Sequence, residues 1–257
     1  MNKDKLFNLN GKTAIVTGGG NGIGKACCEI LAEFGASVTV SDLKLADAEK
    51  VANDINSSGG KAIAAECNVT KDEDLVTLTE RTVSELGGVH ILVNNAGGGG
   101  GGRENPFKIS VDDFAWVFKL NVFSAWRLSQ LCVPHMKKDG YGSIVNITSM
   151  SSVNRSPNMS AYAASKAAMN HMTCNLAMDF GPEVRVNAVG PGATKTAALA
   201  SVLTPEIEAK MLEHTPIKKL GEPSDISGAV LYFAAPVSEW VSGQILFVNG
   251  GGTQTLD

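Results

Sequence analysis

Two side chains near the middle of the sequence have the chemical types and the spacing of an acid–base pair. Tyr162 and Lys166 stand four residues apart, so a helix over residues 160–180 would place both on one face. Free tyrosine titrates near pH ~10, which is too high for a general base in neutral water. An ammonium ~4 Å away, at an effective dielectric of ~20, is worth ~4 kcal/mol and would bring the pKa of Tyr162 near neutrality. Such a phenol can take a proton from an alcohol or return one to a ketone.

A tyrosine and a merely solvated lysine also fall at this spacing by chance, so other residues must decide. Ser149 directly follows a predicted strand, 143–148, and lies thirteen residues before Tyr162. Asn121 lies within a predicted helix over 110–137, although asparagine is only a modest helix former. Its amide either packs within the fold or points into a catalytic pocket.

A glycine-rich turn near the N-terminus has the pattern of a dinucleotide site. Residues 12–17 are predicted to form a buried parallel strand. Gly18, Gly22 and Gly24 follow it, before an amphipathic helix that ends near Phe34. Glycines let the backbone approach a pyrophosphate, which the positive end of the helix dipole stabilises. The turn is therefore predicted to bind phosphate.

Asp42 ends the second predicted strand, eighteen residues beyond Gly24. A dinucleotide-binding fold has an acidic residue at this place, which accepts hydrogen bonds from the adenosine ribose hydroxyls. The carboxylate would also repel a 2′-phosphate and so favours NAD over NADP. The alternative is that Asp42 is the N-cap of the next helix, a position that aspartate also suits.

Strands and helices alternate along the whole chain, which predicts an α/β fold with one doubly wound, Rossmann-type parallel sheet of about seven strands flanked by helices. Residues 1–257 are expected to form a single NAD(P)-binding domain. Six consecutive glycines, 97–102, follow the fourth strand; we interpret them as a wall of the active site that continues into a mobile loop. Residues 193–222 are interpreted as a substrate lid. The other predicted strands are 37–42, 61–66, 89–95, 184–190 and 244–248, and the other helices are 45–58, 71–86 and 223–235.

Composition excludes several classes of protein. The 257 residues are 44% hydrophobic and 19% charged, with a formal charge of −4, which suits a globular chain and gives no nucleic-acid surface. The first residues lack an apolar signal region, and no apolar run is long enough for a membrane span. Five cysteines show no CxxC pairing; they are expected to be reduced thiols of a cytoplasmic protein, not a disulfide frame or a metal site.

The motifs together resemble those of the short-chain dehydrogenase/reductase family over nearly the full chain. The matching residues are Thr17-Gly18-x-x-x-Gly22-Ile-Gly24, Asn94-Asn-Ala-Gly97, Asn121, Ser149, Tyr162-x-x-x-Lys166 and Pro191-Gly192.

The resemblance implies a role for each matching residue. Tyr162 would be the general acid/base, and Lys166 would lower its pKa and hold the nicotinamide ribose. Ser149 would hydrogen-bond the reacting oxygen, and Asn121 would support a water-linked proton relay to Lys166. The residues implied to contact the cofactor are Gly18, Asn21, Gly22, Ile23, Gly24, Asp42, Asn68, Val69, Asn95, Tyr162, Lys166, Gly192 and Thr196. Those implied to contact the substrate are Gly99, Ser149, Asn154 and Tyr162.

The chain departs from the family pattern at Asn68, which precedes Val69. Many relatives have aspartate there, and its carboxylate accepts from the adenine amino group. Asn68 can accept through its carbonyl, but without a charge, so adenine binding is expected to be weaker.

Within the family, segments 91–100 and 204–217 are similar to bacterial NAD-dependent 7α-hydroxysteroid dehydrogenases, which oxidise a bile-acid hydroxyl to the 7-ketone by hydride transfer. A 3-oxoacyl-carrier-protein reductase or another secondary-alcohol dehydrogenase of the same family is the alternative, and a non-catalytic NAD-binding scaffold is a remote one. An acyl-carrier reductase would use NADPH, which Asp42 disfavours. The resemblance also implies a homotetramer, with helices 110–137 and 160–180 between subunits.

Overall fold

One sheet of seven parallel strands forms the centre of the computed structural model, which describes residues 6–99, 104–200 and 203–252. Its strand order, β3-β2-β1-β4-β5-β6-β7, confirms the predicted Rossmann-type α/β fold. Strands are added outward on one side of β1 and then on the other, so the order reverses between β1 and β4. The strands are β1 (Thr13–Thr17), β2 (Ser37–Asp42), β3 (Lys61–Glu66), β4 (Ile91–Asn94), β5 (Gly142–Ile147), β6 (Val184–Pro191) and β7 (Ile245–Val248).

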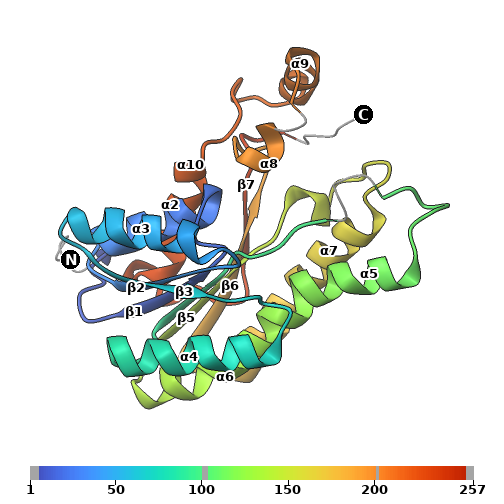
Figure 1. The fold of residues 1–257 in the computed structure, drawn as a ribbon. Coiled ribbons are helices and arrows are strands. Elements are labelled where there is room, and N and C mark those ends of the chain that lie inside the picture. Colours follow the sequence, from blue (N-terminus) through green and yellow to red (C-terminus); the bar gives the residue numbers. More distant parts are fainter. Residues whose placement is uncertain (1–5, 100–103, 201–202, 253–257) are drawn as a thin grey trace.

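Helices cover both faces of this sheet (Figure 1). On one face lie α2 (Gly22–Glu33), α3 (Leu45–Ser57) and α10 (Pro223–Ala234). On the other lie α4 (Asp72–Leu86), α5 (Val111–Phe118), α6 (Ser124–Lys138) and α7 (Ser160–Phe180). Two short helices, α8 (Ala197–Ala200) and α9 (Pro205–Glu213), stand beyond the strands near the upper end of β7 in Figure 1.

The apolar core has two layers because successive strand residues point to opposite faces. On β1, Ala14 and Val16 pack with the α2, α3 and α10 side, whereas Ile15 packs with the α4, α6 and α7 side. All five residues of β1 are buried. A strand that is buried on both faces needs a continuous apolar run, which is the pattern that predicted it.

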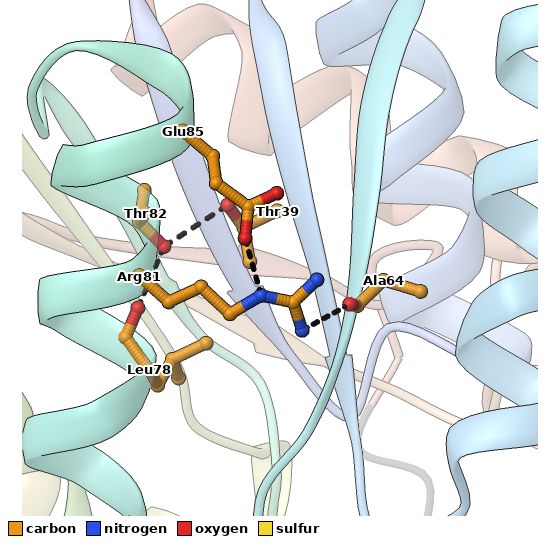
Figure 2. A network of polar contacts seen from close by, with 6 residues as sticks. All are labelled: Thr39, Ala64, Leu78, Arg81, Thr82 and Glu85. Carbon is orange, nitrogen blue, oxygen red and sulfur yellow. Dashed lines mark hydrogen bonds and ion pairs between the residues drawn. The ribbon is translucent and has the colours of Figure 1, made fainter.

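Polar contacts fix α4 against the edge of the sheet (Figure 2). Arg81 Nη1 donates to the Ala64 carbonyl of β3 at 2.8 Å, and its Nε pairs with Glu85 at 2.5 Å. The buried Thr82 hydroxyl donates to that of Thr39 on β2 at 3.0 Å. These contacts tie α4 to the middle of β2 and of β3, the strands that lead to Asp42 and Asn68.

One predicted helix differs from the observed ones, and one predicted segment is described here in more detail. The single helix expected over 110–137 is interrupted by a turn of π-helix, η1 (Lys119–Phe123), between α5 and α6. The segment 193–222 contains α8 and α9, and it is tied to itself by a bridge between Thr194 and Gly221. Whether this segment acts as a lid stays a prediction. No helix among the described residues is both long and apolar enough to span a membrane.

The tight packing of the first turn generates a test of the fold. A Cβ on Gly24 would lie 2.0 Å from the Gly18 carbonyl oxygen and 2.6 Å from Asn95 Nδ2. We predict that Gly24→Ala destabilises the protein by about 1–3 kcal/mol, because the obstacle is backbone. The control is Gly228→Ala, in the exposed part of α10 with no atom within 4 Å, which should stabilise by about 0.5–1 kcal/mol. Urea unfolding measures both, and equal effects would contradict the packing argument.

Candidate functional site

The predicted site residues gather at the carboxyl ends of the strands. In an open parallel sheet, ligands bind in the crevice where the strand order reverses. Here the reversal lies between β1, which leads into the glycine-rich turn, and β4, which leads into Asn95 and the glycine run. The first three glycines of that run, 97–99, are described; glycines 100–102 lie outside the described residues.

The glycine-rich turn has a backbone that other residues would strain. Gly18 and Gly22 have φ of +61° and +52°, in the left-handed region that favours glycine. The N-cap of α2 is Asn21, whose side chain makes no capping hydrogen bond, and the first turn carries no acidic residue. Gly22, Ile23 and Gly24 therefore present the positive end of the helix without a competing local carboxylate. An anionic phosphate fits this arrangement.

Asp42 does not cap α3, because the N-cap of that helix is Lys44. The Asp42 carboxylate is 9% exposed. It accepts from the backbone N–H groups of Gly20 at 2.9 Å and Lys44 at 3.1 Å. The alternative interpretation as an N-cap is thus wrong. The carboxylate sits against the glycine-rich turn, and its contact with a ribose stays a prediction.

Asn68 makes an Asx-type turn after β3. Its Oδ1 accepts from the Thr70 backbone N–H at 3.0 Å and from the Thr70 hydroxyl at 2.8 Å. Its own N–H donates to Asp74 at 2.9 Å, and Val69 is buried beside it. Both lone pairs of the carbonyl oxygen are occupied. Acceptance from an adenine amino group would require release of Thr70, so this role stays a prediction.

Asn95 joins the ends of β1 and β4. Its Nδ2 donates to the carbonyls of Thr17 at 2.9 Å and Gly18 at 3.1 Å. The Thr17 hydroxyl accepts from the backbone N–H groups of Asn95 and Ala96. These contacts fix the glycine-rich turn relative to β4, so Asn95 acts here on the shape of the crevice.

Residues from the second half of the chain close over the turn. The Gly192 N–H donates to the Val248 carbonyl at 2.9 Å, which anchors the exit from β6. Thr196 directly precedes α8, and its Oγ1 accepts from Leu199 N at 3.4 Å. The Thr196 methyl would lie 3.4 Å from a Cβ at Gly22. Segments far apart in the sequence therefore meet at the predicted cofactor loop.

Tyr162 and Lys166 lie one turn apart on α7, as predicted. The Lys166 ammonium is buried, with its side chain 3% exposed, and Nζ donates to the Ile147 carbonyl at 2.8 Å. It lies 5.8 Å from the centroid of the Tyr162 ring. Burial lowers the pKa of Lys166 to about 8.

The expected fall in the pKa of Tyr162 is wrong for this structure. Burial raises the pKa of the phenol, and the hydrogen bond with Ser149 offsets this only in part. The sequence argument counted the attraction of an ammonium but not the loss of water around the phenolate. A tyrosine that acts as a base here needs further positive charge close to its oxygen.

Ser149 is placed by the chain that follows β5. It is the N-cap of the short helix η2 (Met150–Ser152), and its hydroxyl accepts from the Ser151 N–H at 3.1 Å. Asn170 of α7 donates to the Ser152 hydroxyl at 2.7 Å, which donates to the Ser149 carbonyl at 2.6 Å. The serine is thus held by the same helix that carries Tyr162.

Asn121 lies in the π-helix η1 and is 1% exposed. Its Oδ1 accepts from Gly98 N at 2.9 Å, and its Nδ2 donates to the Gly98 carbonyl at 2.9 Å and to Ser165 Oγ at 2.8 Å. π-Helical turns commonly occur at functional sites. These contacts use the amide within the fold, where it fastens the glycine run to α7. The catalytic role of Asn121 stays a prediction.

The two predicted substrate contacts other than Ser149 and Tyr162 are Gly99 and Asn154. A Cβ on Gly99 would lie 3.3 Å from Tyr162 Cβ, so the glycine backbone packs on the tyrosine. Asn154 follows η2, and its Nδ2 is buried without a hydrogen-bond partner in the described part of the chain. A buried donor without a partner is costly, and a polar group of a substrate would satisfy it.

Sequence reasoning missed Glu104 and Ser165. Glu104 is 3% exposed and accepts from backbone N–H groups at the start of α7. No local pattern marks it, since it follows the glycine run in a loop. Ser165 stands within the Tyr162–Lys166 segment, and its spacing of three from Tyr162 was an available signal. No cluster of His, Cys, Asp or Glu suited to a metal occurs among residues 6–99, 104–200 and 203–252.

The chain resembles known proteins along its whole length. Residues 18–253 match the family described as enoyl-(acyl carrier protein) reductase. The 7α-hydroxysteroid dehydrogenase of Escherichia coli K12 is 50% identical, with both chains fully covered. That of Clostridium sardiniense is 38% identical over 95% of this chain and 94% of its own. A solved 7α-hydroxysteroid dehydrogenase, complexed with NADH and 7-oxo glycochenodeoxycholic acid, superposes with a TM-score of 0.96 at 50% identity over both full chains.

The buried lysine predicts how stability varies with pH. Because the pKa of Lys166 falls from 10.5 to about 8 on folding, the unfolded chain binds more protons between these values. The loss of folding stability from burying the charged lysine is therefore complete below pH 8, and it fades as pH rises towards 10.5. Relative to Lys166→Met, we predict that the wild-type free energy of unfolding increases by on the order of 1–2 kcal/mol from pH 7.5 to 9.5. Urea unfolding at both pH values measures it; a constant difference would contradict the shift.

Proposed function

Because this chain belongs to the short-chain dehydrogenase/reductase family, we propose that it oxidises the 7α-hydroxyl group of bile acids and related hydroxysteroids to the 7-ketone with NAD. The observation that carries the proposal is the full-length likeness to the dehydrogenase whose structure holds NADH and a 7-oxo bile acid. The protein is an oxidoreductase, and the polar residues at the strand ends support the proposed reaction. The acyl-carrier reductase and the non-catalytic scaffold are not favoured.

The residues of the crevice fit NAD. The positive φ of Gly18 and Gly22 and the first turn of α2, which has no local carboxylate, suit a pyrophosphate. Asp42 would accept hydrogen bonds from the adenosine ribose hydroxyls, and one of its oxygens also accepts from the Gly20 N–H. A 2′-phosphate beside this carboxylate would be repelled, so NADP is disfavoured. Thr196 faces Gly22 and would close over the cofactor from the other side.

NAD, when bound, accepts the hydride and brings a positive nicotinamide ring to the site. In the oxidation, the Tyr162 oxygen takes the proton of the substrate hydroxyl. Ser149, which hydrogen-bonds to the phenol, would hold the reacting oxygen. Lys166 supplies positive charge from its buried ammonium. In the reverse direction, Tyr162 returns the proton to the ketone oxygen.

Asn121 would support proton transfer through the position of Lys166. A Cβ on Gly97 would lie 2.7 Å from Asn121 Oδ1 and 3.2 Å from Lys166 Nζ. Because Gly97 has no side chain, the Asn121 amide oxygen and the Lys166 ammonium both border the small space beside its Cα. A water molecule there would link the two groups, as the family relay requires.

Substrate contacts are proposed on the side of Tyr162 away from the sheet. Gly99 packs on Tyr162, and the unpartnered Asn154 Nδ2 would donate to a substrate oxygen. Segment 193–222 would cover the steroid, whose rigid rings lose little conformational freedom on binding. Burial of such a polycycle gains roughly 25 cal/mol per Å² of apolar area.

We propose a homotetramer that assembles through the α5–α6 side. Exposed aromatic residues occur there, with Trp116, Phe123 and Trp126 between 47% and 56% exposed. Phe123 lines two apolar hollows, one with Phe114 and Phe118 and the other with Trp126 and Met172. Large exposed aromatic groups mark an interaction surface.

A cytoplasmic location is proposed because all five cysteines are free thiols.

The substrate proposal is tested with bile acids that differ only at carbon 7. We predict that wild-type protein with NAD oxidises chenodeoxycholate but not its 7β epimer, ursodeoxycholate, because the epimer points its carbinol hydrogen away from the nicotinamide. Tyr162→Phe is the control, and loss of the acid/base should lower the rate by about 10²–10⁴-fold. NADH formation, followed at 340 nm, measures the wild-type rates with the two bile acids and the rate of Tyr162→Phe with chenodeoxycholate. Equal rates for the epimers, or no rate with either, would overturn the assignment.

The assembly proposal is tested by light scattering. We predict a solution mass near four times the 26.8 kDa of one chain, and a smaller mass for Trp126→Glu, because a buried charge at a subunit interface is costly. Leu43→Glu, at an exposed apolar residue beyond β2, is the matched control and should keep the wild-type mass. A monomeric wild type, or a Trp126→Glu variant that remains tetrameric, would refute this interface.

A further inference from the structure

A buried carboxylate holds the start of the helix that carries Tyr162. Glu104 is 3% exposed and reaches α7 from the loop before α5. One of its oxygens accepts from the Ala161 N–H, and both oxygens lie 3.1 Å from the Tyr162 N–H. The carboxylate therefore binds the backbone of the catalytic tyrosine itself.

Within the part of the chain that the structure describes, the N-cap residue of this helix does not cap it. The N-cap of α7 is Met159, which has φ −130° and ψ 17° and a side chain that makes no capping hydrogen bond. The first N–H groups of a helix lack partners within the helix. Glu104, from a distant part of the chain, supplies acceptors for two of these N–H groups. Its negative charge lies at the positive end of the helix dipole.

The loop before α7 is fastened to the same residue. The Glu104 N–H donates to the carbonyl of Asn158, whose φ of 55° is uncommon for a residue other than glycine. Glu104 thus grips the chain before the helix through its backbone and the first turn through its side chain. In the described ranges, no lysine or arginine forms an ion pair with it, so helix N–H groups are its partners.

We propose that Glu104 is a positioning residue for Tyr162, a role that rests on the proposed dehydrogenase function. The phenol oxygen must meet both Ser149 and the substrate hydroxyl, and a misplacement of about 1 Å can cost about 10²-fold in rate. Tyr162 is the third residue of α7, where a helix without a cap frays. The carboxylate fixes this turn, and with it the direction of the tyrosine side chain.

A carboxylate suits this task better than an amide of the same shape. Both of its oxygens accept, whereas glutamine offers one acceptor and one donor. In Glu104→Gln the amide N–H₂ would face a backbone N–H, so one of the two contacts is lost. Glu104→Asp keeps two acceptor oxygens on a side chain that is shorter by one methylene, and should recover part of the function.

The experiment compares wild type, Glu104→Gln and Glu104→Asp with Asp225→Asn as control. Asp225 is also a capping carboxylate, which accepts from the Glu222 N–H at the start of α10. Three readouts are needed: kcat and KM with the secondary alcohol that wild type oxidises best, the Kd of NADH by fluorescence, and amide hydrogen exchange of the peptide 158–166 by mass spectrometry.

We expect Glu104→Gln to lower kcat about tenfold or more, to leave the Kd of NADH and the KM within about twofold, and to speed exchange in residues 158–166. Glu104→Asp should lie between, and Asp225→Asn should keep the wild-type kcat. Faster exchange with unchanged kcat would reduce Glu104 to a structural cap, and unchanged exchange would refute the contact. A wild type that oxidises other alcohols but no bile acid defeats the steroid proposal alone, since the kcat ratio and the exchange still test Glu104.

Discussion

The burial of the Lys166 ammonium is the constraint on which the site depends. An isolated buried charge is expensive, and this one has a carbonyl oxygen, that of Ile147, as its close partner. Its lowered pKa records that cost. The neighbouring residues leave room for the ammonium. A side chain at Gly97 would contact Lys166 Nζ, and the amide oxygen of Asn121 borders the same space beside Gly97. The fold accepts this loss of stability and keeps a positive charge near Tyr162, where the proposed proton transfer would use it.

The long helix α7 carries this charge because it is held along its length. A buried polar chain joins it to the centre of the sheet, from Asn94 on β4 through Asn146 on β5 to Thr173, with bonds of 2.9 Å at both steps. Asn121 reaches the same helix at Ser165. Fully satisfied buried networks specify one arrangement. The helix that carries Tyr162 and Lys166 is therefore joined by buried hydrogen bonds to the centre of the sheet and to η1, which is the kind of support that the proposed catalysis would need.

The cofactor side of the crevice relies on backbone more than on side chains. Gly24 packs so closely on Gly18 that a methyl group would not fit, and Asn95 bonds to the same carbonyl. One carboxylate oxygen of Asp42 accepts a hydrogen bond from the Gly20 N–H. The loop is thus shaped by the ends of three strands, and small residues are needed at every close approach. This explains why the turn needs glycine at Gly18 and Gly24.

The sequence by itself determined the seven strands, the glycine-rich turn and the Tyr162–Lys166 pair, because apolar runs, turn residues and helical spacing are local properties. It did not determine the π-helical turn at Asn121, since a single inserted residue leaves the apolar pattern almost unchanged. The raised pKa of Tyr162 was predicted with the wrong sign, because desolvation depends on atoms from distant segments. Glu104 escaped notice for the same reason. Its partners lie more than fifty residues away, and only the folded chain brings a loop carboxylate to the first turn of α7.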